Sequence, residues 1–202
     1  MRNRCDRAPA TIVTCRPLSP FLGLLFAKAN ISTKSPAHSK FRLLPFDVNV
    51  AGLTDTATRV HAEGAWLVGQ LWHPGKQQLW GPTRSPMGVS DQPDALSWTV
   101  PHVMSEDEIG SVVQAYVDTA SRLADCGFAG VELHGAHGYL IQQFMSPWSN
   151  WRTDRYGGSL EGRLTFVREV ATGIRNRCGH TFILGLKMAG TEGVEGGIDE
   201  DQ

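Results

Sequence analysis

The fold of this chain is decided by residues 105–133, which read SEDEIGSVVQAYVDTASRLADCGFAGVEL. Ser105 and Glu108 form the S-x-x-E capping box that begins a helix, and the apolar residues of the next turns follow helical spacing. Gly127 suits the left-handed position that ends a helix. Because the apolar run Gly130–Leu133 follows at once, the stretch predicts a helix, a glycine stop and a buried strand.

The same order of elements occurs on both sides of this stretch. A helix expected over about Leu53–Glu63 stops at Gly64 and leads into the strand AWLVGQLWH, and one over about Leu160–Arg177 stops near Gly179 and leads into TFILGLKMA. Continuously apolar strands that alternate with helices indicate an α/β fold with a parallel sheet covered by helices. No G-x-G-x-x-G follows any of these strands, which favours a (β/α) barrel over a dinucleotide-binding sheet.

Composition limits the class of protein. The 202 residues suit one domain, 41% of them are hydrophobic and 19% charged, and the net charge of −1 does not suggest a nucleic-acid partner. The four scattered cysteines argue against a zinc site or a disulfide framework, so we expect a cytoplasmic protein. No apolar run reaches the ~18 residues of a membrane span.

The N-terminus has two interpretations. Arginines precede the apolar stretch PFLGLLFA, and Ala27-Lys28-Ala29 fits the small-x-small pattern of a signal-peptide cleavage site. The alternative is a buried strand over Leu22–Phe26.

Polar side chains follow the expected strands at the point where each one ends. Their positions are Gln70 and His73, then His134, His137 and Tyr139, and finally Lys187. In a barrel of this kind the carboxyl ends of the strands carry the active site. A histidine pair can bind an oxygen atom and a tyrosine hydroxyl can deliver a proton. The pair could also be structural; a metal site is less favoured, because no cysteine or carboxylate lies nearby at ligand spacing.

The residues after the central strand resemble the old yellow enzymes, or NADH:flavin oxidoreductases, which are FMN-binding TIM barrels. The matching segments read HGAHGYL, FMSPWSN, WRTDRYGGS and LEGR, with VGQLWHPGK upstream and LGLKMAGTEGVEGG downstream. The resemblance covers about Ser32–Gln202 and extends more weakly to Leu22. It implies a partial (β/α)8 TIM barrel over residues 21–202, covering roughly strands two to five, with residues 1–20 unassigned.

The resemblance also implies roles for the polar residues. His134 and His137 would bind the oxygen of an unsaturated carbonyl or nitro substrate. Tyr139 would protonate the α-carbon of that substrate after hydride transfer from reduced FMN, with NADH or NADPH as reductant. Gln70 would bind the pyrimidine edge of the flavin, or be a buried structural amide. Lys187 stands where the family usually has arginine, near the flavin, or is a surface lysine. Ala29 matches a small cofactor-binding residue at the end of the second strand.

Several further expectations concern loops and departures from the family. Arg152 and Asp154 would close the loop after the site by an ion pair, and the long segment between Gln77 and Ser105 would form a lid. Lys76, in place of arginine, would be a surface change, whereas Gly162, in place of asparagine, would weaken a helix start.

The family's first strand and its last three strands, with the loops that hold the flavin phosphate, have no counterpart in this sequence. The alternative is therefore a truncated, non-catalytic chain that cannot retain FMN alone. Such a chain could pair with another copy or with a complementary half-barrel.

Overall fold

The computed structural model describes residues 12–14, 24–30, 46–78, 85–95 and 98–201, and it describes side chains from residue 50 onward within these ranges. The strands are β1 (Ile12–Thr14), β2 (Leu24–Asn30), β3 (Trp66–Trp72), β4 (Met87–Gly88), β5 (His102–Val103), β6 (Gly130–Gly135) and β7 (Ile183–Met188). The helices are α1 (Phe46–Ala62), α2 (Glu106–Asp125), α3 (Leu140–Met145), α4 (Leu160–Arg163) and α5 (Thr165–Cys178), with a 3-10 turn, η1, at Gly75–Gln77.

The main sheet has the strand order β1-β2-β3-β6-β7. Its last four strands are parallel, and β1 pairs with β2 in the antiparallel direction. Helix α1 connects β2 to β3, α2 precedes β6, and α5 precedes β7, so the expected alternation of parallel strands with helices is confirmed. The antiparallel strand β1 was not expected from the sequence.

Helix α2 has the start and the stop that its sequence predicts. The Ser105 hydroxyl accepts from the Glu108 amide at 3.2 Å and the Glu108 carboxylate accepts from the Ser105 amide at 2.8 Å, which completes the capping box. Gly127 then takes a left-handed conformation with φ of 87°. Phe128 turns back onto the core, and β6 begins two residues later.

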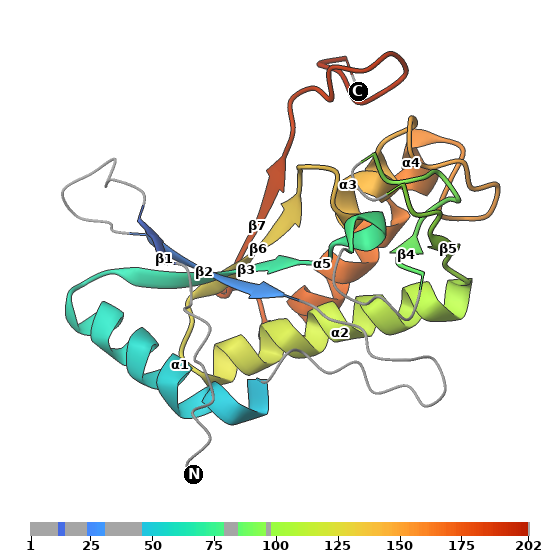
Figure 1. Cartoon of the computed structure of the whole chain (residues 1–202). Helices are drawn as coiled ribbons and strands as arrows, with labels where there is room; N and C mark the ends of the chain where they lie inside the picture. The colour runs from blue at the N-terminus through green and yellow to red at the C-terminus, as the bar shows by residue number, and fades with distance from the viewer. Residues whose placement is uncertain (1–11, 15–23, 31–45, 79–84, 96–97, 202) are drawn as a thin grey trace, which may run out of the picture.

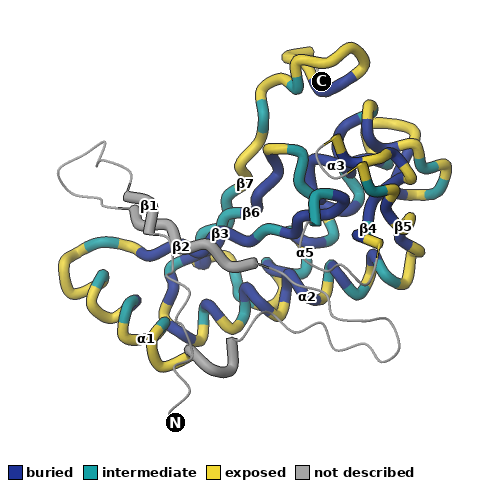
Figure 2. The backbone as a smooth tube through the Cα atoms, in the orientation of Figure 1, coloured by how far each residue is buried: buried dark blue, intermediate teal, exposed yellow. Residues whose placement is uncertain are grey.

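Helices α1 and α2 lie along one side of the sheet, whereas α3 and α4 lie beyond the carboxyl ends of β3 and β6 (Figure 1). Buried residues concentrate in β3, β6, α3 and the inner side of α2, while the segment after β7 is mostly exposed (Figure 2). Leu71, Leu123, Val131 and Leu133 belong to this core. A Cβ at Gly69 would lie 2.6 Å from Leu123 Cδ1, so this glycine allows α2 to pack closely on β3.

Strand β7 is the last strand of the sheet, and its far edge pairs with none of the described residues. Leu186 and Met188 near its end are 41% and 53% exposed, which is unusual for large apolar side chains of a parallel strand. The sheet is thus open at β7, and the described residues form no closed barrel.

Element boundaries differ from the expectations in three places. Helix α1 begins at Phe46, seven residues before Leu53. The loop after the histidine pair contains the short helix α3, which had not been expected. The helix expected over Leu160–Arg177 is divided into α4 and α5 at Leu164, which itself keeps a right-handed helical conformation. At the N-terminus, Leu24–Asn30 forms a strand, in agreement with the strand interpretation of that stretch.

Candidate active site

The sequence-predicted histidine pair and tyrosine lie together at the carboxyl end of β6. The ring centroids of His134 and His137 are 4.9 Å apart, those of His134 and Tyr139 are 4.9 Å apart, and those of His137 and Tyr139 are 6.4 Å apart. His134 is buried, Tyr139 is half-buried and His137 is exposed. The three side chains therefore form one cluster that extends from the sheet to the surface.

A left-handed turn produces this cluster. His137 and Gly138 have φ values of 60° and 71°, and Tyr139 then begins α3 as its N-cap. A left-handed conformation is uncommon for any residue other than glycine, although histidine is among the better tolerated ones. The turn therefore stores a small strain that the surroundings must offset.

Hydrogen bonds with three glutamine side chains stabilise this left-handed turn. Gln142 Oε1 accepts from the Gly138 amide at 2.8 Å, and Gln143 Nε2 donates to the Gly138 carbonyl at 2.7 Å. Gln77, from η1, donates to the His137 carbonyl at 3.0 Å. Main-chain groups on both sides of the turn are thus held by hydrogen bonds, which fixes the backbone that carries the His137 side chain.

The hydrogen bond at His134 Nδ1 determines which ring nitrogen can donate. Nδ1 accepts from the Ala136 amide at 3.3 Å. In a neutral imidazole the proton must then be on Nε2, which makes Nε2 a donor. A ring with this tautomer can donate to an oxygen atom, and the role of the pair in binding substrate stays a prediction.

Tyr139 is positioned from the opposite side by Trp72, the last residue of β3. Their ring centroids lie 4.8 Å apart at an interplanar angle of 51°. The Tyr139 ring thus contacts both an aromatic ring of β3 and the imidazole of β6.

Gln70 of β3 meets a residue that sequence reasoning did not select. Gln70 is 5% exposed, and its Nε2 donates to Glu132 Oε1 of β6 at 2.5 Å. Its carbonyl oxygen is buried and accepts no hydrogen bond from the described part of the chain. An unpaired buried carbonyl is costly and is expected to meet a donor. This oxygen therefore fits the imide N–H of a flavin pyrimidine ring.

The signal for Glu132 was present in the sequence. It is a charged residue inside the apolar run G-V-E-L-H, two residues before His134 and thus on the same face of the strand. A carboxylate in such a run is rarely left without a partner.

The two remaining predicted cofactor residues take different positions in the sheet. Lys187 is exposed on β7 and pairs in register with His134. Position 29 pairs with Leu71, whereas position 28 pairs with Gln70. Ala29 is therefore one step away from the row of Gln70, and its side chain lies outside the described residues. The assignments of both residues stay predictions.

Lys76 is not a surface residue, so that expectation is wrong. It is 8% exposed, its Nζ donates to Gln92 Oε1, and the ammonium lies 5.0 Å from the centroid of the Trp148 ring. Burial lowers the pKa of Lys76, and the carboxylates of Asp94 and Glu192 oppose this effect. Burial of the Lys76 ammonium is tolerated because its surroundings supply an amide oxygen, an aromatic face and nearby negative charge.

The ion pair expected between Arg152 and Asp154 is confirmed. Arg152 Nε donates to both carboxylate oxygens at 3.1 Å, and this hydrogen bonding holds the pKa of Asp154 below its usual value. Arg152 Nη1 also donates to the carbonyls of Met104 at 2.7 Å and Val89 at 3.2 Å. The guanidinium therefore fastens the described part of the predicted lid to the loop between α3 and α4, beside which β4 and β5 lie (Figure 1).

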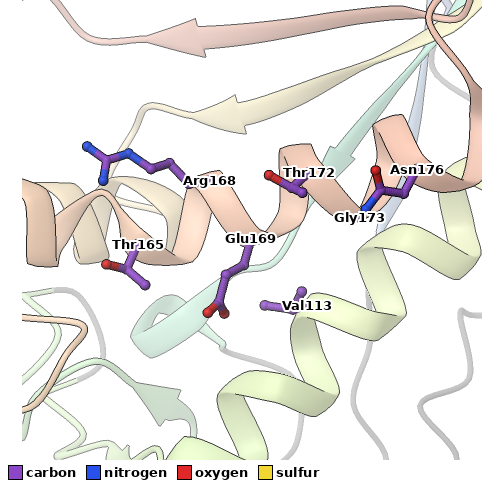
Figure 3. A pocket seen from close by; sticks show the side chains of 7 residues that line it. All are labelled: Val113, Thr165, Arg168, Glu169, Thr172, Gly173 and Asn176. Carbon is purple, nitrogen blue, oxygen red and sulfur yellow. The ribbon is translucent and has the colours of Figure 1, made fainter.

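A shallow groove between α2 and α5 contains none of these site residues. It is lined by Val113 of α2 and, from α5, by Thr165, Arg168, Glu169, Thr172, Gly173 and Asn176 (Figure 3). Glu169 is already engaged by the Tyr156 hydroxyl at 2.9 Å. Among the residues that the structure describes, no three histidine, cysteine or acidic side chains gather into a metal site, and no helix has the length and apolar character needed to cross a membrane.

Comparison with known proteins gives consistent matches. A sequence model of the NADH:flavin oxidoreductase / NADH oxidase family matches residues 21–201. An NADH oxidase of Thermoanaerobacter brockii is 40% identical over 153 residues, which are 75% of this chain and 24% of that protein. An NADPH dehydrogenase of Halalkalibacterium halodurans is 37% identical over 179 residues, which are 87% of this chain and 51% of that protein.

A solved structure shares the fold. It is a complex of 2-naphthoyl-CoA reductase with 2-naphthoyl-CoA, 31% identical, with a TM-score of 0.71 over 77% of this chain and 26% of that one. The chain thus spans about a quarter to about half the length of these proteins. Together with the parallel sheet, these matches confirm the predicted class, an α/β fold that forms part of a (β/α)8 barrel.

Proposed function

Because the chain belongs to the NADH:flavin oxidoreductase / NADH oxidase family, we propose that its site serves an FMN-dependent ene-reductase. The reaction would reduce the carbon–carbon double bond of an unsaturated carbonyl or nitro compound, and NADH or NADPH would be the reductant. The resemblance to the old yellow enzyme family is confirmed by the family match. A flavin cofactor and a nicotinamide donor agree with the family and with the names of its relatives.

The cluster of His134, His137 and Tyr139 carries the proposal. Two imidazoles with centroids 4.9 Å apart can direct donors at a single oxygen atom of a substrate. Such donors withdraw electron density from the conjugated alkene, so that its β-carbon accepts hydride and the negative charge that develops on oxygen is stabilised. The buried His134 donates through Nε2, and His137 approaches from the exposed side.

Tyr139 would supply the proton. Its ring centroid lies 4.9 Å from that of His134, so the phenol would be next to a substrate held by the histidines. A phenol is a weak acid, which suits protonation of an enolate-like carbon without early loss of the proton. The contact with Trp72 fixes the ring in that position.

Gln70 and Lys187 would hold the cofactor, with Ala29 beside them. The unpaired buried carbonyl of Gln70 fits the N–H of the flavin's pyrimidine ring, and an ammonium near the ring stabilises negative charge on it. When bound, FMN supplies the hydride for the reaction. Lysine in place of arginine keeps the charge but lacks the planar fork, so we expect weaker cofactor binding than in relatives that have arginine.

The open edge at β7 favours a second candidate: a chain that cannot retain FMN by itself and is not catalytic alone. The exposed Leu186 and Met188 lie at that edge, where a further strand of the same chain, a second copy or a complementary half-barrel could pair. The small-molecule site and the cytoplasmic setting proposed here are the same for both candidates.

One experiment separates the two. The purified chain is incubated with FMN and desalted, and its visible absorbance is recorded. The loaded protein is then assayed for NADH and NADPH oxidation with 2-cyclohexenone and with a nitroalkene. Retained flavin together with alkene reduction that is lost in His134→Ala supports the ene-reductase. Absence of retained flavin at saturating FMN supports the second candidate.

A further inference from the structure

We propose that Glu132 is a positioning residue that fixes the orientation of the Gln70 side-chain amide, so that its carbonyl faces the cofactor and selects a ring with an N–H at that point. This inference deepens the proposed function and rests on the chain's binding of a flavin. It adds a role for Glu132, which the sequence analysis did not select as a site residue.

The sheet brings the two residues together. Gln70 of β3 and Glu132 of β6 are direct partners in the parallel ladder, so they point to the same face of the sheet. The next member of that row is Gly185 of β7, where a Cβ would lie 3.9 Å from that of Glu132. Gly185 has no side chain that could bond to the Glu132 carboxylate, and Gln70 is the neighbour that does.

The chemistry of the pair determines which way the amide points. A carboxylate only accepts hydrogen bonds, whereas an amide has a donor end and an acceptor end. The contact of 2.5 Å between the two side chains must therefore come from the NH2 group of Gln70. A flipped amide would place its carbonyl against the carboxylate, where two acceptors repel each other.

Fixing the NH2 end leaves the carbonyl end for a ligand. Gln70 is only 5% exposed, and its Oε1 accepts no hydrogen bond from the described residues. The NH2 group has two hydrogens, and the bond to Glu132 uses one of them, which leaves the other to donate to a ligand. The side chain thus offers an acceptor next to a donor, which matches an imide N–H beside a carbonyl on the edge of a flavin.

The row of Gln70 and Glu132 lies next to the row of His134 and Lys187 on the same face, two residues along each strand. The carboxylate is therefore between the residue that would hold the cofactor and the residue that would hold the substrate. Loss of Glu132 should therefore affect binding of the flavin ring more than it affects the histidine cluster. The tautomer of His134 in that cluster is fixed by the Ala136 amide.

The test uses lumiflavin and 3-methyllumiflavin, because these rings carry no phosphate and probe the pyrimidine edge alone. Binding to the full chain is measured by quenching of flavin fluorescence. We expect the methylated ring to bind the wild-type protein at least ~10-fold more weakly, since one hydrogen bond to a buried acceptor is lost. In Glu132→Gln, where the amide of Gln70 is free to flip, we expect this ratio to fall below ~3-fold.

A rescue variant distinguishes positioning from general packing. Gln70→Glu alone places two carboxylates in contact and should bind lumiflavin at least ~10-fold more weakly than wild type. Adding Glu132→Gln restores a donor–acceptor pair with an oxygen facing the ligand, and should recover most of that loss. Glu63→Gln, at an exposed position before β3, is the matched control and should leave both affinities unchanged.

Equal methylation ratios in wild type and Glu132→Gln, or no recovery in the double variant, would overturn the proposal. If the wild-type chain binds neither ring, the ligand part of this inference fails, whereas the proposed function fails only if FMN is not retained either. The orientation itself is then decided in ligand-free protein. Nitrogen-15 spectra should show a downfield Nε2 proton for Gln70 in wild type that is absent in Glu132→Gln.

Discussion

The imidazole rings of His134 and His137 lie 4.9 Å apart because His137 has a left-handed main-chain conformation with φ of 60°. In an extended or right-handed conformation the second ring would turn away from the first. The catalytic pair of the proposed enzyme therefore depends on a strained backbone position, which Gln77 and the glutamines of α3 support.

The strain at His137 can be measured by two substitutions that both remove the imidazole. Asparagine tolerates a left-handed conformation, whereas valine is β-branched and does not. We expect the free energy of unfolding of His137→Val to be ~1–2 kcal/mol lower than that of His137→Asn, as measured by urea denaturation. Equal stabilities would mean that the turn relaxes at no cost.

Replacing Tyr139 by phenylalanine should separate proton delivery from cofactor reduction. The ring stays in contact with Trp72 and His134, but the hydroxyl is lost. In protein loaded with FMN, we expect reduction of 2-cyclohexenone to slow by ~10²–10⁴-fold, the usual size of a general-acid effect. NADPH oxidation with oxygen as acceptor should be unchanged. If both rates fall together, Tyr139 has a structural role instead.

His73 should make the protein less stable in mild acid. It is 1% exposed, and burial lowers its pKa to about 4 from the 6.5 of an unfolded histidine. Between these values the unfolded chain binds a proton that the folded chain does not. The free energy of unfolding should therefore fall as the pH drops from about 6.5 to about 4, by up to ~1.4 kcal/mol per pH unit, and His73 should contribute no slope above that window.

The control for His73 is His73→Asn. Its side-chain oxygen can still accept from the Gly75 amide, as His73 Nδ1 does at 3.0 Å, but it does not titrate. The difference between the wild-type and variant stability curves should be flat above pH 6.5 and should slope below it. Parallel curves over the whole range would contradict the assignment.

The sequence predicted the parts of this structure that depend on local patterns. The α2–β6 unit followed from a capping box, helical spacing and a glycine stop, and the cluster at His134, His137 and Tyr139 followed from motif spacing. Helix α3 was missed because six residues are too few to show a helical period.

Features that depend on tertiary packing were beyond a local pattern. Lys76 was misjudged because its burial depends on Gln92 and Trp148, which come from distant segments. Glu132 was overlooked because its meaning depends on the register with Gln70, and register between strands is a tertiary property.

Arg152→Lys should loosen the described part of the predicted lid. The guanidinium donates to Val89, Met104 and Asp154, and lysine keeps the charge but cannot reach all of these acceptors. We expect the free energy of unfolding to fall by ~1.5–3 kcal/mol, and residues 85–104 to become more sensitive to limited proteolysis. Arg168→Lys, at an exposed position on α5, should stay within ~0.5 kcal/mol of wild type. Proteolysis that is unchanged in Arg152→Lys would show that other contacts hold the segment.

Gly162 stands where the family pattern has asparagine. A Cβ at this position would lie 2.1 Å from the Gly157 carbonyl oxygen, and this oxygen can move only if the backbone of the turn moves with it. Gly162→Asn should therefore destabilise the chain by ~1–3 kcal/mol.

The matched control is Gly110→Ala on α2, where a Cβ meets nothing within 4 Å. This substitution should stabilise the helix by ~0.5–1 kcal/mol, because alanine loses less conformational entropy than glycine on folding. Thermal unfolding of the two variants beside wild type measures both effects, and a Gly162→Asn protein as stable as wild type would show that the Gly157–Gly162 turn can open to accept a side chain.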